Sequence, residues 1–199
     1  MDKKQEIIAA AFELFCENGY HLSLSEIANA VGIKTPSLYS HFKSKDDILE
    51  LMIHEEIYRY YQFLEEKLID IEPMNIKDAM KSLFEFFMDY FSEYKRLRFW
   101  RTIPLLPNEQ LRNTSSHLIN EKDSQCKQKL LAYFQKGVRD GDLKPDVTES
   151  SLHLYLCMIQ GVLDAMLLYP NDYKDNIFAE RVLEAYWDGI SARKANERE

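Results

Sequence analysis

The segment between Glu26 and Asp46 combines basic side chains with short hydroxyl side chains. It contains no acidic residue, although the whole chain has a formal net charge of -8. Its basic residues are Lys34, His41, Lys43 and Lys45. Cationic side chains can neutralise nucleic-acid phosphates, and small hydroxyl groups allow a close approach to base edges. The segment therefore has the local chemistry of a surface that contacts a polyanion.

Two short helices are expected to position these side chains. Ser23 begins the first helix in a capping box with the glutamate three residues later, and Gly32 ends that helix. Thr35 and Pro36 begin the second helix as N-cap and first helical residue. Two short helices joined by a glycine-containing turn form a helix-turn-helix. The second helix, about residues 35 to 41, would lie across the DNA major groove.

The second of these helices is expected to have an inner and an outer face. Leu38 and Phe42 are four residues apart and can pack inward together. This arrangement leaves Ser37, Tyr39 and Ser40 facing outward. A tyrosine face or a proline ring can pack on a thymine methyl group, and a serine hydroxyl can approach a base edge. Capped helix starts also offer backbone amides to phosphate oxygens.

Helix-turn-helix geometry alone also occurs in unrelated helical proteins, so the sequence itself decides the prediction. The TetR family of transcriptional regulators has a recognition-helix motif that resembles the string GIKTPSLYSHFKSKDDIL in this chain. The first two helices of that family are similar, in order and spacing, to the upstream string AAFELFCENGYHLSLSEIANAVG. The resemblance covers roughly residues 3–53, and beyond them only length and helix pattern agree.

The resemblance implies roles for individual residues. Base edges or thymine methyl groups would be contacted by Ser25, Thr35, Pro36, Ser37 and Tyr39. Backbone phosphates would be contacted by Ser23, Tyr39, His41, Lys43, Ser44 and Lys45. Ser25 departs from the family members that have a base-reading arginine at that position, and Ser40 replaces a larger aromatic side chain found in others. The operator sequence therefore does not follow from the resemblance.

Helical periodicity continues to the end of the chain and predicts an all-α protein with about nine helices. The expected helices are 3–18, 24–31, 35–41, 45–68, 76–94, 95–103, 108–137, 148–168 and 174–190. We expect residues 1–46 to form a three-helix DNA-binding domain with the helix-turn-helix. The larger helical domain, 47–199, would bind a ligand and dimerise. Pro104 and Pro107 would interrupt the helices of that domain.

The last two helices, about 148–168 and 174–190, have broad apolar surfaces. In the TetR family such helices form a four-helix bundle with those of a second copy, so the resemblance implies a homodimer. The same apolar residues also fit the core of a single chain, and both uses are open at this stage. Gly161 would allow a close approach between helices. A dimer suits a palindromic operator.

Aromatic side chains are frequent between residues 76 and 137 and can line a site for a flat or lipophilic molecule. Acidic side chains nearby would suit a cationic group. The candidate pocket residues are Phe84, Phe87, Met88, Phe91, Trp100, Tyr133, Phe134, Tyr155 and Asp164. Each of these aromatic residues fits a packed core equally well, so pocket and core are both retained as interpretations.

Other classes of protein fit the sequence poorly. His54, Glu55 and Glu56 begin like a zinc-protease helix motif, but position 58 is Tyr58 instead of the second histidine. We find no phosphate loop, nucleophile elbow or clustered Cys/His set, so we expect no enzyme, metal or cofactor. No stretch approaches about 20 uncharged apolar residues. Three widely separated cysteines favour a reducing compartment. We expect a cytoplasmic protein without a membrane segment.

The sequence and the family resemblance together predict a dimeric regulator that occupies double-stranded operator DNA. Repression is the preferred interpretation, and activation is the alternative. A small-molecule effector in the larger domain would shift the fourth helix, about 45–68, and change the separation of the two recognition helices. Such coupling requires that the ligand bind the two states with different affinity. Alternatively, the helical domain binds a partner protein instead of a small molecule, and retained DNA binding without small-molecule release would indicate this.

Overall fold

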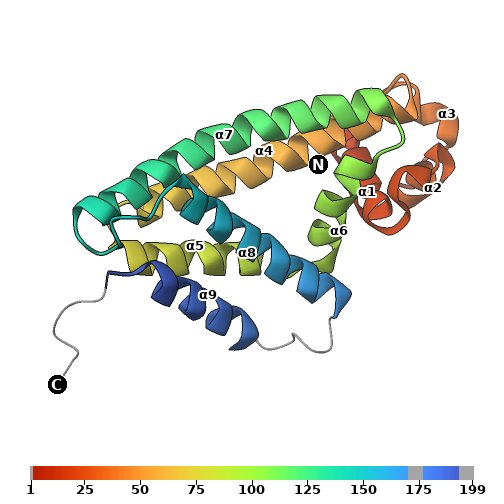
Figure 1. The fold of residues 1–199 in the computed structure, drawn as a ribbon. Helices are drawn as coiled ribbons and strands as arrows, with labels where there is room; N and C mark the ends of the chain where they lie inside the picture. Colours follow the sequence, from red (N-terminus) through yellow and green to blue (C-terminus); the bar gives the residue numbers. More distant parts are fainter. Residues whose placement is uncertain (1, 170–176, 193–199) are drawn as a thin grey trace. The chain divides into compact units, whose positions relative to one another are not determined.

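The computed structural model describes residues 2–169 and 177–192, and these residues are mainly helical (Figure 1). The described ranges contain nine α-helices and no β-strand, apart from a single bridge between Leu143 and Ser191. The prediction of an all-α fold with about nine helices is therefore confirmed. The helices are α1 (Lys3–Asn18), α2 (Leu24–Ala30), α3 (Thr35–Leu38), α4 (Lys45–Ile71), α5 (Ile76–Tyr90), α6 (Tyr94–Thr102), α7 (Glu109–Arg139), α8 (Glu149–Leu168) and α9 (Ile177–Ile190). Short 3-10 helices cover Gly19–His21 and Ile103–Leu105.

Most helix bounds lie close to the predicted ones, with two exceptions. The helix predicted over 35–41 is α-helical only to Leu38, and its N-cap is Lys34 instead of Thr35. The backbone continues in turns, in which Phe42 N–H donates to the Leu38 carbonyl at 3.0 Å. α5 ends at Tyr90, four residues before the predicted end, although no glycine or proline marks this position. Residues 174–176 of the predicted last helix lie outside the described residues.

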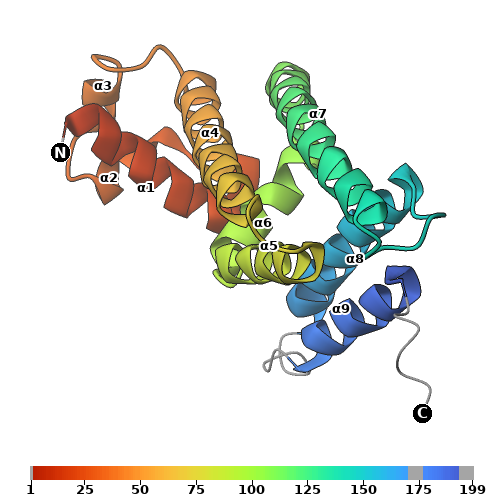
Figure 2. The same ribbon diagram turned by 90° about the vertical axis from the view of Figure 1, so that its left-hand side faces the viewer.

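The chain divides into two compact units, and the first comprises Met1–Phe63 and Glu93–Asp123. In this unit α6 packs on α1, although the two helices are far apart in sequence. The centroid of the Phe99 ring lies 5.5 Å from that of the Phe12 ring and 5.7 Å from that of the Phe15 ring. α1, α2 and α3 lie together at the N-terminal end of the chain (Figure 2). Packing of α6 thus supports α1, on which α2 rests, and α3 packs in turn on α2.

Hydrogen bonds fix the start of α4 in the first unit. The Tyr20 hydroxyl donates to the Asp46 carboxylate at 2.8 Å, and the Asn108 side-chain amide donates to the same carboxylate at 2.9 Å. Asn108 also caps α7, because its side-chain oxygen accepts from the Leu111 amide at 3.0 Å. One turn of α4 is therefore held by two segments distant in sequence. Further along α4, the Tyr61 hydroxyl donates to Asp123 of α7 at 2.7 Å.

The second unit comprises Leu64–Ser92 and Ser124–Glu199. Its core contains Tyr155 of α8, which is fully buried and donates its hydroxyl to the Met80 carbonyl at 2.7 Å. α8 and α9 lie side by side in both views (Figure 1 and Figure 2). The Tyr186 hydroxyl of α9 donates to the Ser151 carbonyl of α8 at 2.5 Å. The predicted division into a DNA-binding domain (1–46) and a ligand-binding and dimerisation domain (47–199) differs from these compact units and stays a prediction.

α8 has an unusual balance between hydropathy and burial. Among the described residues it is the one helix that is long and apolar enough to cross a membrane, judged by length and composition alone. The sequence-based expectation that no stretch approaches a membrane span is corrected by this finding. Only 28% of its 18-residue apolar window is buried inside the chain. Much of the apolar surface of α8 is thus uncovered in a single copy.

Candidate nucleic-acid interface

The start of α2 is fixed by the capping box that the sequence predicts. The Ser23 amide donates to the Glu26 carboxylate at 2.7 Å, and the Glu26 amide donates to the Ser23 hydroxyl oxygen at 3.2 Å. The Ser23 hydroxyl also donates to the same carboxylate at 2.7 Å. These hydrogen bonds from Ser23 lower the pKa of Glu26. The first turn of α2 therefore has a defined position relative to the preceding chain.

The turn between α2 and α3 depends on a glycine. Gly32 has φ +69°, which L side chains rarely adopt. The Gly32 amide donates to the Asn29 carbonyl at 3.2 Å, and the Ile33 amide donates to the Ala28 carbonyl at 3.0 Å. This pair of bonds is a Schellman motif, which closes the helix and turns the chain sharply. Gly32 thereby sets the direction in which α3 begins.

α3 and the turns after it have the two faces that the sequence predicts. Leu38 and Phe42 are buried, with 1% and 5% of their surfaces exposed. Ser37 and Ser40 are exposed, and Tyr39 is 59% exposed. The Ser40 hydroxyl donates to the Ser37 carbonyl at 2.6 Å, which fixes its rotamer. A polar face with one large aromatic side chain is thus anchored by the buried side chains of Leu38 and Phe42.

The predicted DNA-contacting residues fall into two groups by exposure. The exposed group consists of Ser25, Pro36, Ser37, Tyr39, His41, Lys43 and Ser44. The half-buried group consists of Ser23, Thr35 and Lys45. All of them lie between the start of α2 and the start of α4, within the first compact unit. Their roles toward bases and phosphates stay predictions.

Lys45 has partners inside the chain that its predicted phosphate role did not anticipate. Its ammonium group donates to the Tyr20 carbonyl at 2.8 Å and lies 4.0 Å from the centroid of the Tyr20 ring. The neighbouring Ser44 hydroxyl oxygen accepts from the Asp47 amide at 3.1 Å, and the Lys43 amide donates to the Asp47 carboxylate at 2.9 Å. These contacts leave the exposed side chain of Lys43 as the better placed cation.

Sequence reasoning missed a lysine on α1. Lys4 is exposed, and its ammonium nitrogen lies 5.5 Å from the centroid of the Phe42 ring. It therefore adds a positive charge beside the segment that contains Lys34 and Lys43. No local pattern could have indicated this position, because Lys4 and Phe42 are separated by 38 positions in the chain.

The candidate pocket residues are split between the two compact units. Trp100 belongs to the first unit, and the other eight belong to the second. The aromatic residues at positions 84, 87, 91 and 134 are buried. The hydroxyl groups of Tyr133 and Tyr155 both donate to backbone carbonyls, at Met74 and Met80 respectively. These contacts tie both tyrosines into the packing of the second unit.

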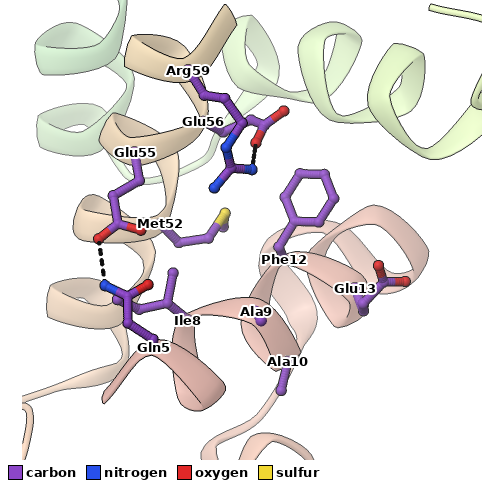
Figure 3. Close-up of a pocket in the computed structure, with 10 residues that line it drawn as sticks. All are labelled: Gln5, Ile8, Ala9, Ala10, Phe12, Glu13, Met52, Glu55, Glu56 and Arg59. Carbon is purple, nitrogen blue, oxygen red and sulfur yellow. Dashed lines mark hydrogen bonds and ion pairs between the residues drawn. The ribbon is translucent and has the colours of Figure 1, made fainter. Parts of the chain in front are cut away.

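A cavity of about 430 Å³ lies in the first unit and is lined by α1 and α4 (Figure 3). None of the candidate pocket residues lines it. Its lining residues are Gln5, Ile8, Ala9, Ala10, Phe12, Glu13, Met52, Glu55, Glu56 and Arg59. Among the described residues, no group of three or more His, Cys, Asp or Glu side chains is arranged to hold a metal ion.

The sequence is similar to known bacterial regulators. Residues 7–52 match the family model described as bacterial regulatory proteins, tetR family. The HTH-type transcriptional regulator YvaF of Bacillus subtilis is 24% identical over 202 residues, covering 96% of each chain. The fatty acid metabolism regulator protein of the same organism is 27% identical over 196 residues, covering 94% of this chain and 95% of the relative. The negative transcriptional regulator IcaR of Staphylococcus aureus is 38% identical over 93 residues, covering 37% of this chain and 50% of the relative.

Solved structures share the fold over nearly the whole chain. The regulator FadR from Bacillus subtilis, in complex with stearoyl-CoA, superimposes with a TM-score of 0.68 at 24% identity, covering 94% of this chain and 98% of that one. A TetR-family regulator from Mesorhizobium loti gives a TM-score of 0.72 at 19% identity, covering 95% and 96%. A complex of SmeT with triclosan gives a TM-score of 0.72 at 15% identity, covering 98% of this chain and 94% of that one.

Proposed function

Since this chain belongs to the TetR family of bacterial regulatory proteins and is a DNA-binding transcriptional regulator, we propose that it acts as a dimeric repressor. It occupies a palindromic operator in the cytoplasm and leaves the DNA when a small lipophilic or aromatic ligand binds. Residues 1–46 bind the DNA, and residues 47–199 bind the ligand and dimerise. The observation that supports this most directly is the polar face of α3 and of the turn after it, where Ser37 and Tyr39 are exposed.

The proposed DNA contacts follow from exposure and chemistry. Ser37 and Tyr39 face solvent on α3 and the turn after it, where they can meet base edges and thymine methyl groups. Lys43 and His41 are exposed beside them and suit phosphate contacts. The remaining base-contacting residues are Ser25, Thr35 and Pro36, and the remaining phosphate-contacting residues are Ser23, Tyr39, Ser44 and Lys45. Lys45 would have to exchange its Tyr20 contacts for a phosphate.

The proposed dimer would cover the uncovered stripe of α8. Leu154 and Leu168 are 59% and 67% exposed, and Cys157 and Gly161 between them are exposed too. These residues follow one another at helical spacing, so they lie on one face. A second copy of the chain would bury this stripe and let two helices approach closely at Gly161, where an added Cβ atom would meet nothing within 4 Å. Exposed Phe178 of α9 extends the apolar surface.

Repression and ligand release are proposed from the relatives as well as the fold. One relative is described as a negative transcriptional regulator, and another as a fatty acid metabolism regulator. Two proteins with the same fold have been solved with stearoyl-CoA and with triclosan, both of which have large apolar parts. The ligand of this chain would lie among the candidate pocket residues and shift α4, which extends from the DNA-binding segment into the second unit.

A mobility-shift assay on the DNA that flanks the protein's own gene tests this function, first across a salt series and then with lipophilic ligands. We expect a discrete shift at nanomolar protein that weakens as salt rises, because phosphate contacts release counterions. A lipophilic effector would then abolish the shift. If selection from genomic fragments also yields no specific site for a folded protein, the regulator function is wrong. DNA binding that no small molecule releases would favour a protein partner.

A further inference from the structure

The cavity between α1 and α4 has an apolar floor and a charged rim (Figure 3). The floor is formed by Ile8, Ala9, Phe12 and Met52. Its volume, about 430 Å³, lies within the range of small-molecule sites. A hydrocarbon or aromatic group in this space would contact a phenyl ring from α1 and a polarisable thioether from α4.

The rim of the cavity has a negative charge that the chain leaves uncompensated. Of its three carboxylates, Glu13 forms an ion pair with Lys95. Glu56, with only 2% of its surface exposed, pairs with Arg59 at 2.6 Å. Glu55 meets no cationic side chain within the described ranges and accepts only from the Gln5 amide, at 3.4 Å. Glu55 is therefore the acceptor that a ligand cation would find available.

We propose that this cavity binds a small organic amine, in which one ammonium group is attached to an apolar body. The ammonium group pairs with Glu55 and displaces the long contact from Gln5, while the body packs on Phe12 and Met52. A cation over the Phe12 ring gains further from the ring quadrupole. An anionic ligand is disfavoured, because the only cation on the rim, Arg59, is already paired with Glu56. This site is distinct from the ligand site among the candidate pocket residues.

An occupied cavity would affect the DNA-binding part of the chain, and this consequence rests on the proposed function. The amine contacts α1 and α4 at once, and the Gln5–Glu55 contact that links these helices is the one it replaces. Since α1 packs on α2, a change in the spacing of α1 and α4 alters the support of the helix-turn-helix. Binding and its effect on DNA are measured separately, so either can fail without the other.

Isothermal titration calorimetry of the full chain tests the site. The probe is 2-phenylethylammonium, and the matched neutral compound is 2-phenylethanol. We expect the ammonium compound to bind about fivefold or more tightly than the alcohol, because only the cation pairs with Glu55. Equal affinities, or no heat with the ammonium compound, would overturn the proposal.

Three variants locate the probe. Glu55→Gln should weaken the ammonium compound about fivefold and leave the alcohol unchanged. Ala9→Leu fills the floor with a good helix former and should prevent binding of both compounds. Asp70→Asn removes an exposed acid elsewhere on α4 and should change neither. Circular dichroism confirms that each variant is folded. Full affinity in Ala9→Leu would place the probe elsewhere and contradict the assignment.

Discussion

At the scale of single residues, Tyr39 is the side chain whose exposure has the clearest functional meaning. It is 59% exposed and follows directly on buried Leu38, so its ring has no role in the core. We predict that Tyr39→Ala weakens operator binding about tenfold, since the variant loses the apolar contact of the ring with a thymine methyl group. The free energy of unfolding should change by less than about 0.5 kcal/mol. Fluorescence anisotropy with labelled operator DNA and urea denaturation measure the two effects.

Tyr58→Ala is the matched control for that substitution. Tyr58 is also a tyrosine with 54% exposure, and it lies on α4 away from the α2–α3 segment. Its replacement should leave operator affinity unchanged. Normal affinity in the Tyr39 variant, or equal loss in both variants, would show that α3 does not contact the DNA as proposed.

Cys16 provides a pH-dependent test of packing in the first unit. Burial, and next the nearby carboxylate of Glu13, raise the pKa of its thiol from 9.0 to about 12. The folded state thus prefers the neutral thiol, and this contribution to stability is complete below pH 9.0. It is lost progressively as the pH rises from 9.0 toward 12, because the unfolded chain ionises first.

We therefore predict that Cys16→Ala loses less stability than the natural chain between pH 9 and 10.5. At pH 7 the variant should be about 1 kcal/mol less stable, because it lacks the buried sulfur atom. The difference between the two proteins should narrow as the pH rises. Urea denaturation at pH 7, 9 and 10.5 measures this, and parallel losses of stability in both proteins would mean that the thiol ionises without penalty in the folded state.

At the scale of elements, the turn between α2 and α3 is the most sensitive connection. An added Cβ atom at Gly32 would meet nothing within 4 Å, so a substitution there acts through backbone conformation alone. We predict that Gly32→Ala lowers the free energy of unfolding by about 1–2 kcal/mol, which is the cost of a left-handed conformation. Operator affinity should fall too, because the direction of α3 changes. Thermal unfolding and anisotropy provide the measurements.

Gly32→Asn separates the conformational cause from other effects. Asparagine adopts the left-handed region more readily than alanine does, so this variant should recover part of the stability and of the affinity. An asparagine variant as damaged as the alanine variant would point to a steric cause that the free space around Gly32 does not show.

Local sequence signals predicted most of the helical elements. They could not predict contacts between segments that are distant in the sequence. Ser23, Gly32 and the apolar spacing of Leu38 and Phe42 fixed the helix-turn-helix in advance, because caps and turns depend on adjacent residues. The packing of Phe99 on α1 involves residues more than 80 positions apart, so periodicity could not indicate it. Lys4 and the α1–α4 cavity escaped prediction for the same reason.

At the scale of the whole molecule, the uncovered stripe of α8 predicts self-association. Replacing Leu154 and Leu168 together with glutamate places charges on the proposed contact. These side chains are mostly exposed in one copy, so the single chain should still fold, while the dimer should dissociate. Analytical ultracentrifugation measures the mass of the particle in solution. Operator affinity should fall when the dimer dissociates. A variant that remains dimeric would place the interface elsewhere.

The same stripe allows an independent check, because Cys157 is exposed whereas Cys16 and Cys126 are buried. A short bis-maleimide should link two native chains through Cys157, and Cys157→Ser should remain unlinked. A membrane could also cover an apolar helix, and flotation with lipid vesicles tests for that association. We expect the protein to stay out of the lipid layer, and co-flotation would favour membrane association over a dimer.

The two compact units are also expected to differ in their tryptophan fluorescence. The chain has two tryptophans, and each unit contains one of them. The indole N–H of Trp100 is buried and has no hydrogen-bond partner among the described residues, and its ring lies 4.7 Å from that of Tyr60. Trp187 is half-buried, with the Lys77 ammonium 5.6 Å from its ring centroid. In the Trp187→Phe variant, tryptophan fluorescence would therefore report on unfolding of the first unit alone. In the Trp100→Phe variant it would report on unfolding of the second unit. Melting of each half becomes visible without any attached dye.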